Sequence, residues 1–138
     1  MKNLLATTAV LEFGTGLMLT ALPSTLATLL LGSRLDTPVG LTIARVGGVA
    51  LLTIGTACWL GRVESESRVA RGLASAMLLY NAGAVAILVY ARLTLGLSGI
   101  GLWPAVVVHT ALAGWCIANL LKPLPNRAVT HGPADRDR

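Results

Sequence analysis

Charged residues are scarce in this 138-residue chain. They make up 12% of it, whereas hydrophobic residues make up 54% and the mean hydropathy is +0.73. A soluble domain carries about twice that charged fraction. The composition therefore excludes an ordinary soluble domain and indicates a membrane protein. Because the chain is long enough for four membrane spans and little else, we expect one compact bundle with no soluble domain.

Cysteine and histidine are also few, and the motifs built on them are missing. The two cysteines, Cys58 and Cys116, cannot form a CxxC pair, and two thiols alone make a poor zinc site, so we expect free, buried thiols. Since His131 is the only histidine besides His109, haem ligation by two histidines of one chain is not expected. GxGxxG, P-loop and HExxH patterns are absent. We predict no metal site, and the sequence leaves any cofactor unknown.

Four apolar stretches are long enough to cross a bilayer, which takes about 20 helical residues. Thr37 followed by Pro38 is a helix-start signal for the second stretch. The first stretch resembles a signal peptide, but Glu12 interrupts it, so we expect a retained helix. The predicted spans cover about residues 3–22, 38–61, 69–93 and 102–121.

A short segment separates the first two spans. Pro23 ends the first span, and the nine residues from there to Leu31 are too few to cross a membrane. We expect an interfacial or re-entrant piece ended by Gly32. The fold prediction is an all-α integral membrane four-helix bundle over residues 1–122, followed by a polar, disordered cytoplasmic tail over 123–138.

The basic residues collect on one side of these spans. The net charge of +5 does not indicate nucleic-acid binding, because most basic residues flank apolar spans and no basic patch is interleaved with aromatic residues. By the positive-inside rule both termini should be cytoplasmic, as should the loop between spans two and three. That side holds eight of the eleven basic residues: Lys2, Arg62, Arg68, Arg71, Lys122, Arg127, Arg136 and Arg138.

Each span carries a strongly polar residue well inside it: Glu12, Arg45, Asn81 and His109. Counted from the span starts, they lie about 10 to 18 Å deep, in a band from the midplane to the outer half. A charge at the bilayer centre costs at least about 2.5 kcal/mol. We therefore expect Glu12 and Arg45 to point inward, with Glu12 either paired with Arg45 or protonated. Asn81 and His109 would complete a hydrogen-bonded network, with Tyr80 as a further donor.

The same network also has a purely structural interpretation, and the sequence leaves both open. One polar group per helix could fix packing and register, although polar contacts in membranes average only about 0.6 kcal/mol. A single intramembrane histidine is more often a hydrogen-bonded core residue than a ligand. Trp115 could line a cavity, but core packing is its simpler role.

Several local patterns occur in a recognisable order. They are an acidic residue with small residues from Glu12 to Gly16, a proline-led short segment, an Ala-Arg-x-Gly-Gly run from Ala44 to Gly48, and a Trp-Pro start of the histidine-containing fourth span. In this order the chain resembles the DoxX-like class of small bacterial four-helix membrane proteins. Some members of that class are membrane subunits linked with quinone-dependent oxidoreductases. The resemblance therefore implies a bacterial inner (plasma) membrane protein with a quinone or lipid-like ligand, or a partner subunit.

We expect a small membrane protein whose interior polar site binds a quinone-like or lipidic amphiphile, with donors for its headgroup and aliphatic helix faces for its tail. One alternative is an accessory or structural subunit of a larger membrane complex, or a homo-oligomer. Another is an oligomeric small-solute or proton transporter that titrates Glu12. Direct catalysis is not expected, since no nucleophile–base pair is visible. The candidate ligand-binding residues are Glu12, Arg45, Tyr80, Asn81, His109 and Trp115.

Overall fold

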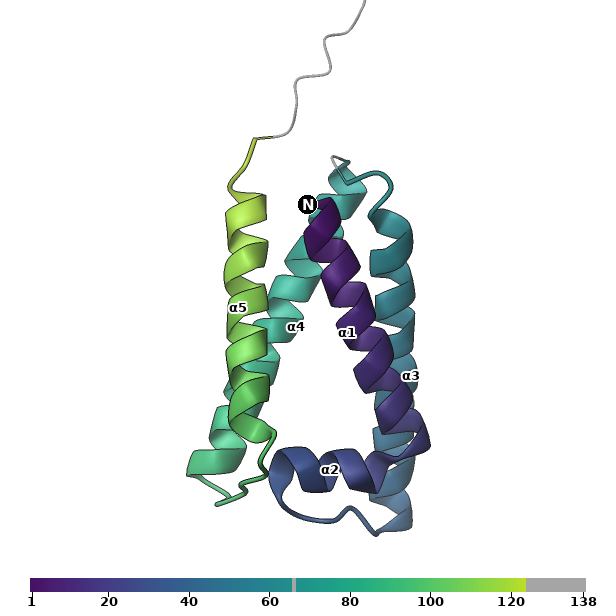
Figure 1. The fold of residues 1–138 in the computed structure, drawn as a ribbon, viewed down its shortest axis with the longest axis vertical. Helices are drawn as coiled ribbons and strands as arrows, with labels where there is room; N and C mark the ends of the chain where they lie inside the picture. The colour runs from purple at the N-terminus through teal and green to yellow at the C-terminus, as the bar shows by residue number, and fades with distance from the viewer. Residues whose placement is uncertain (66, 124–138) are drawn as a thin grey trace, which may run out of the picture.

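The computed structural model describes residues 1–65 and 67–123, and this part of the chain is helical apart from its connections. The predicted all-α fold, with four long helices and a short one after the first, is confirmed. Residues 124–138 of the predicted tail lie outside the described residues. The helices are α1 (Lys2–Ala21), α2 (Pro23–Leu31), α3 (Pro38–Gly61), α4 (Arg68–Leu93) and α5 (Leu102–Leu120) (Figure 1).

Local capping explains where several helices begin and end. The Thr37 hydroxyl accepts a hydrogen bond from the Gly40 amide at 3.2 Å and starts α3 at Pro38, as the sequence predicted. Ser67 caps α4 in the same way, with its hydroxyl 3.1 Å from the Ala70 amide. The short helix α2 stops at Gly32, whose φ of 71° lies in the left-handed region that favours glycine.

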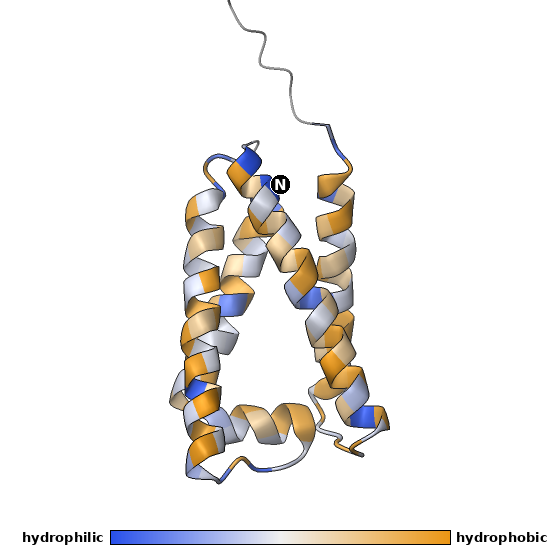
Figure 2. Cartoon of the chain, turned by 180° about the vertical axis from the view of Figure 1, so that it is seen from behind, coloured by the Kyte–Doolittle hydropathy of each residue, from blue (hydrophilic) through white to orange (hydrophobic). Residues whose placement is uncertain are grey.

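The long helices present apolar side chains outward. α1, α3, α4 and α5 contain 20, 24, 26 and 19 residues, and each is long and apolar enough to cross a membrane. Large residues such as Val46, Leu79 and Val107 are 65%, 77% and 65% exposed. Figure 2 shows that hydrophilic residues gather at the ends of the bundle and are sparse along the long helices. This surface fits hydrocarbon as its solvent.

The bundle is built from two helix pairs. α1 packs along α3 and α4 packs along α5, whereas contacts between the pairs are sparse (Figure 1). The α1–α3 contact is made by backbone: a Cβ on Gly16 would lie 2.8 Å from the Gly48 carbonyl oxygen, and one on Gly55 would lie 3.2 Å from that of Ala9. Small residues thus bring these two helices together, as is usual in membranes.

The two pairs are joined differently at their two ends. At the end that carries Met1, here called the Met1 end, a core of side chains from α1, α3, α4 and α5 packs tightly, including Leu5, Cys58, Ala74 and Cys116. At the opposite end, here called the α2 end, the pairs diverge and α2 lies across the gap between them (Figure 1). There the turn before α5 binds the last carbonyls of α2: the amides of Gly99 and Gly101 donate to Leu30 and Leu29 at 3.2 and 2.8 Å.

Candidate functional site

Three helices bring polar residues together inside the bundle. Glu12 of α1 and Asn81 of α4 are buried, with 3% and 0% of their surface exposed. Tyr80 of α4 and His109 of α5 are half-buried. We call these four residues the polar cluster. Its members come from both helix pairs, so the cluster lies where the two halves of the molecule meet.

Asn81 fixes the orientation of His109. The Asn81 side-chain NH₂ donates to the Met77 carbonyl at 2.7 Å, so its oxygen faces the other way. That oxygen lies 2.8 Å from Nδ1 of His109. Because an amide oxygen can only accept, Nδ1 must carry the proton in this arrangement. In the neutral imidazole, Nε2 is then the acceptor, free of the contact with Asn81.

Tyr80 connects the histidine to the carboxyl group. The Tyr80 and His109 rings meet edge to face, with centroids 5.7 Å apart and planes at 77°. The Tyr80 hydroxyl also lies next to the carboxyl group of Glu12. A hydroxyl, a carboxyl and an imidazole nitrogen are therefore gathered in one place. Tyr80 and His109 are half-buried, so part of each of these two residues is exposed.

Arg45 does not join the polar cluster, and its predicted inward orientation was wrong. Its side chain is exposed on α3 among exposed apolar residues such as Ile43 and Val46, and the group beside the Glu12 carboxyl is Tyr80. A long arginine side chain can leave its stem in the hydrocarbon and extend its charge toward the headgroups, which makes this position tolerable. Ala44, one residue earlier, is half-buried. Successive residues of a helix point about 100° apart around its axis, so one step along α3 separates the half-buried face from the exposed one.

Trp115 is also outside the polar cluster. It is 40% exposed, and its backbone carbonyl accepts a hydrogen bond from the Asn119 side chain at 2.9 Å. The free cysteines Cys58 and Cys116 are buried, as the sequence predicted. Within residues 1–65 and 67–123, no three His, Cys, Asp or Glu side chains are grouped so that they could hold a metal ion.

Sequence reasoning missed Thr8. Its side chain is fully buried, and its hydroxyl has no hydrogen-bond partner in the described part of the chain. Thr8 lies one turn before Glu12 on the buried face of α1. The spacing of four residues was visible in the sequence, but nothing there showed that the hydroxyl would be left without a partner. An unpaired buried hydroxyl costs about 1 to 3 kcal/mol, so it is a group that a ligand could satisfy.

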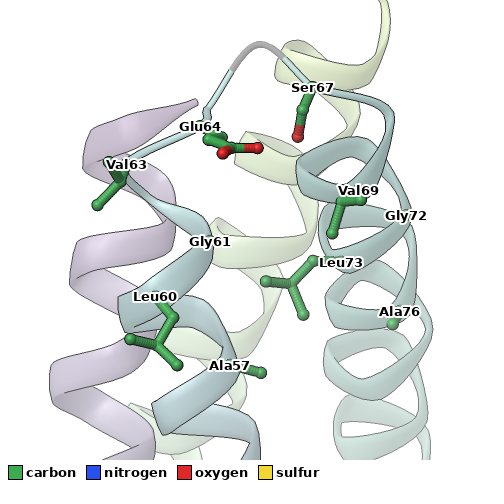
Figure 3. A pocket seen from close by; sticks show the side chains of 10 residues that line it. All are labelled: Ala57, Leu60, Gly61, Val63, Glu64, Ser67, Val69, Gly72, Leu73 and Ala76. Atoms are coloured by element: carbon green, nitrogen blue, oxygen red, sulfur yellow. The ribbon is translucent and has the colours of Figure 1, made fainter.

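A separate pocket of about 600 Å³ lies near the Met1 end, between the end of α3 and the start of α4 (Figure 3). Its walls are mostly apolar, with Leu60 and Leu73 on opposite sides, and Glu64 and Ser67 stand at its rim. None of the predicted ligand-binding residues lines it. This pocket is therefore distinct from the polar cluster.

The fold and the site together define a small multi-pass integral membrane protein that spans the bilayer four times. No protein-family model, curated protein or solved structure matches the chain.

Proposed function

We propose that this membrane protein binds a quinone-like or lipidic amphiphile whose headgroup contacts the polar cluster. The observation that carries the proposal is the 2.8 Å hydrogen bond between Nδ1 of His109 and the side-chain oxygen of Asn81. Because of this bond, Nε2 of His109 faces away from Asn81 and can accept a hydrogen bond from a ligand. The unpaired Thr8 hydroxyl, one turn from Glu12, supports the same conclusion.

The chemistry of the polar cluster suits a headgroup that can both accept and donate. The Tyr80 hydroxyl, or a protonated Glu12, can donate to a carbonyl oxygen, and Nε2 of His109 can accept from a hydroxyl. A quinone–quinol couple has both groups, as does a diacylglycerol-like lipid. The surrounding apolar helix faces would hold the tail. Arg45 and Trp115 have no place in this version of the site, because both are exposed away from it.

Two further parts of the proposal come from the sequence. The order of features around Glu12, Pro23, Arg45 and His109 supports a relationship to the DoxX-like class. The distribution of basic residues supports cytoplasmic termini, and the resemblance to the DoxX-like class supports a location in the bacterial plasma membrane.

The test uses the full-length protein in lipid nanodiscs and a benzoquinone with a decyl tail as the probe. Binding is followed by quenching of tryptophan fluorescence. We expect saturable binding, and we expect Tyr80→Phe to weaken it about fivefold, the size of one lost hydrogen bond. A diacylglycerol added as a competitor distinguishes a quinone site from a general lipid site.

Thr110→Val is the matched control. Thr110 is exposed on α5, one residue after His109, and its hydroxyl donates to the Val106 carbonyl of its own helix at 2.8 Å. This variant should bind the probe as the wild type does. The proposal fails if binding does not saturate, or if Tyr80→Phe and His109→Phe both bind as Thr110→Val does.

One observation favours a second function, that of an accessory subunit. The exposed Arg45 lies within a membrane span, where a carboxylate on a neighbouring protein could pair with it. In that case Arg45→Gln would release the partner from a gently solubilised complex and leave quinone binding unchanged.

A further inference from the structure

A second pocket, of about 500 Å³, lies at the α2 end of the molecule. Residues of α2 form most of its wall, the connection after α2 adds a basic side chain, and the turn before α5 adds an apolar one. The lining residues are Ser24, Thr25, Thr28, Leu29, Arg34 and Ile100. None of them belongs to the polar cluster, so this pocket is separate from the site proposed above.

The fold places the hydroxyl groups of α2 away from the bundle. Pro23 and Leu26 are buried, whereas Thr25 and Thr28 are exposed. The connection to α3 runs back along the outer side of α2 (Figure 1). The Ser24 hydroxyl donates to the Leu35 carbonyl and holds this connection in place. Arg34 is thereby kept beside the start of α2.

The pocket offers both donors and acceptors. The exposed Arg34 guanidinium and Thr25 hydroxyl can donate. Ser24 and Thr28 already give their protons to the carbonyls of Leu35 and Ser24, so their hydroxyl oxygens remain as acceptors. Arg34 supplies the charge of the lining, and Asp36, the acidic residue of the same connection, is not part of it.

The rest of the lining is apolar and open to the surroundings. Leu29 and Ile100 are 42% and 85% exposed. α2 lies across the end of the bundle, so the pocket is at the level where the long helices leave the hydrocarbon (Figure 1). At that level lipid phosphates are the abundant anions, and arginine is well suited to bind them.

We propose that this pocket binds the phosphate diester headgroup of a membrane phospholipid. Arg34 and Thr25 donate to the phosphate oxygens. Ser24 and Thr28 accept from hydroxyl or ammonium groups further along the headgroup. Leu29 and Ile100 contact the start of an acyl chain. The inference does not depend on the quinone-like ligand of the polar cluster.

The experiment uses the full-length protein, stripped of lipid in a maltoside detergent, and phosphatidylglycerol as the probe. Native mass spectrometry gives the lipid concentration at half-saturation of the first bound lipid. We expect Arg34→Gln to raise it about fivefold, as for the loss of one arginine near a phospholipid surface, and Arg34→Lys to restore part of the binding. Arg92→Gln is the matched control, because Arg92 is also exposed at this end but is not in the lining, and it should bind as the wild type does.

Two further probes separate the sources of the phosphate. Diacylglycerol, which lacks the phosphate, should not compete with phosphatidylglycerol. Inorganic phosphate at millimolar concentration should not displace the lipid. The proposal is overturned if Arg34→Gln and Arg92→Gln bind phosphatidylglycerol equally, if diacylglycerol competes as well as the phospholipid, or if free phosphate displaces it.

Discussion

Asn81 uses both ends of its side-chain amide inside the bundle. One end holds the carbonyl of its own helix at Met77, and the other holds His109 on the neighbouring helix. The tautomer of His109 therefore depends on a residue that need not touch a ligand. In the proposed site Asn81 is a positioning residue, whereas Glu12, Tyr80 and His109 are the groups that would contact the headgroup.

Arg45 and Arg71 provide a direct comparison of two arginines in one membrane protein. Arg45 is exposed on α3, whereas Arg71 donates to the carbonyls of Leu120 and Lys122, both at 2.7 Å, and so binds the end of α5. We predict that Arg45→Leu leaves the thermal unfolding midpoint in detergent unchanged or raises it. Arg71→Leu should destabilise the protein by about 2 kcal/mol, because it removes hydrogen bonds from a charged donor.

Both midpoints can be followed by tryptophan fluorescence during heating. If Arg45→Leu proved as damaging as Arg71→Leu, Arg45 would have a structural partner, and the lipid-facing interpretation of its position would be wrong.

At the scale of elements, the most extensive helix–helix contact within residues 1–65 and 67–123 is that between α1 and α3. Gly16 and Gly48 leave no room for a Cβ atom there, and a Cβ on Gly55 would be tightly packed against α1. Gly48 belongs to the stretch from Ala44 to Gly48 that the sequence pattern singled out. Because dispersion and close packing drive helix association in lipid, this contact holds the first helix pair together.

Gly48→Ala tests that contact. The added methyl group would lie 2.8 Å from the Gly16 carbonyl and would also meet Thr20, so the helices must separate. We expect a loss of about 2 kcal/mol, as is usual for overpacking. Gly14→Ala is the matched control, because its Cβ would have nothing within 4 Å, and it should be neutral or mildly stabilising. Equal unfolding midpoints for the two variants in detergent would contradict this account.

The sequence predicted the helices better than it predicted which way their side chains point. The start of α3 at Thr37 and Pro38, and the stop of α2 at Gly32, follow from local chemistry that any fold must obey. The outward position of the Arg45 side chain does not follow from local chemistry. In a membrane both the lipid side and the core side of a helix are apolar, so periodicity says little about which face is inside. The glycines of α3 gave the missing signal, since Gly48 and Gly55 lie on the packed face and Arg45 does not.

The polar cluster could be predicted from the sequence only in part. Glu12, Asn81 and His109 could be recognised as costly residues in a membrane, and the structure brings them near one another. Their partners could not be recognised, because Tyr80 and Arg45 are equally plausible neighbours of Glu12 in a sequence. Only the folded structure distinguishes them, because it places Tyr80 beside Glu12 and leaves Arg45 exposed on α3.

At the scale of the whole molecule, the orientation in the membrane is a prediction that labelling can test. Ser33 lies in the connection at the α2 end, and Ser65 lies in the loop at the Met1 end. From the distribution of basic residues, we expect Ser33→Cys to react with a membrane-impermeant maleimide in intact bacterial cells. Ser65→Cys should react only after the cells are permeabilised. The native cysteines are fully buried and provide a low background. The reverse labelling pattern would place the termini outside.

The short helix α2 determines how far apart the two helix pairs stand at their open end. Only Leu22 separates it from α1, and its last carbonyls accept hydrogen bonds from the turn before α5. Nine residues of helix measure about 13 Å, so α2 sets a fixed distance between the two helix pairs at this end of the bundle. Removing one helical turn from α2 would bring the two helix pairs about 5 Å closer together at this end. The length of α2, from Pro23 to Leu31, thus sets the width of the molecule at this end.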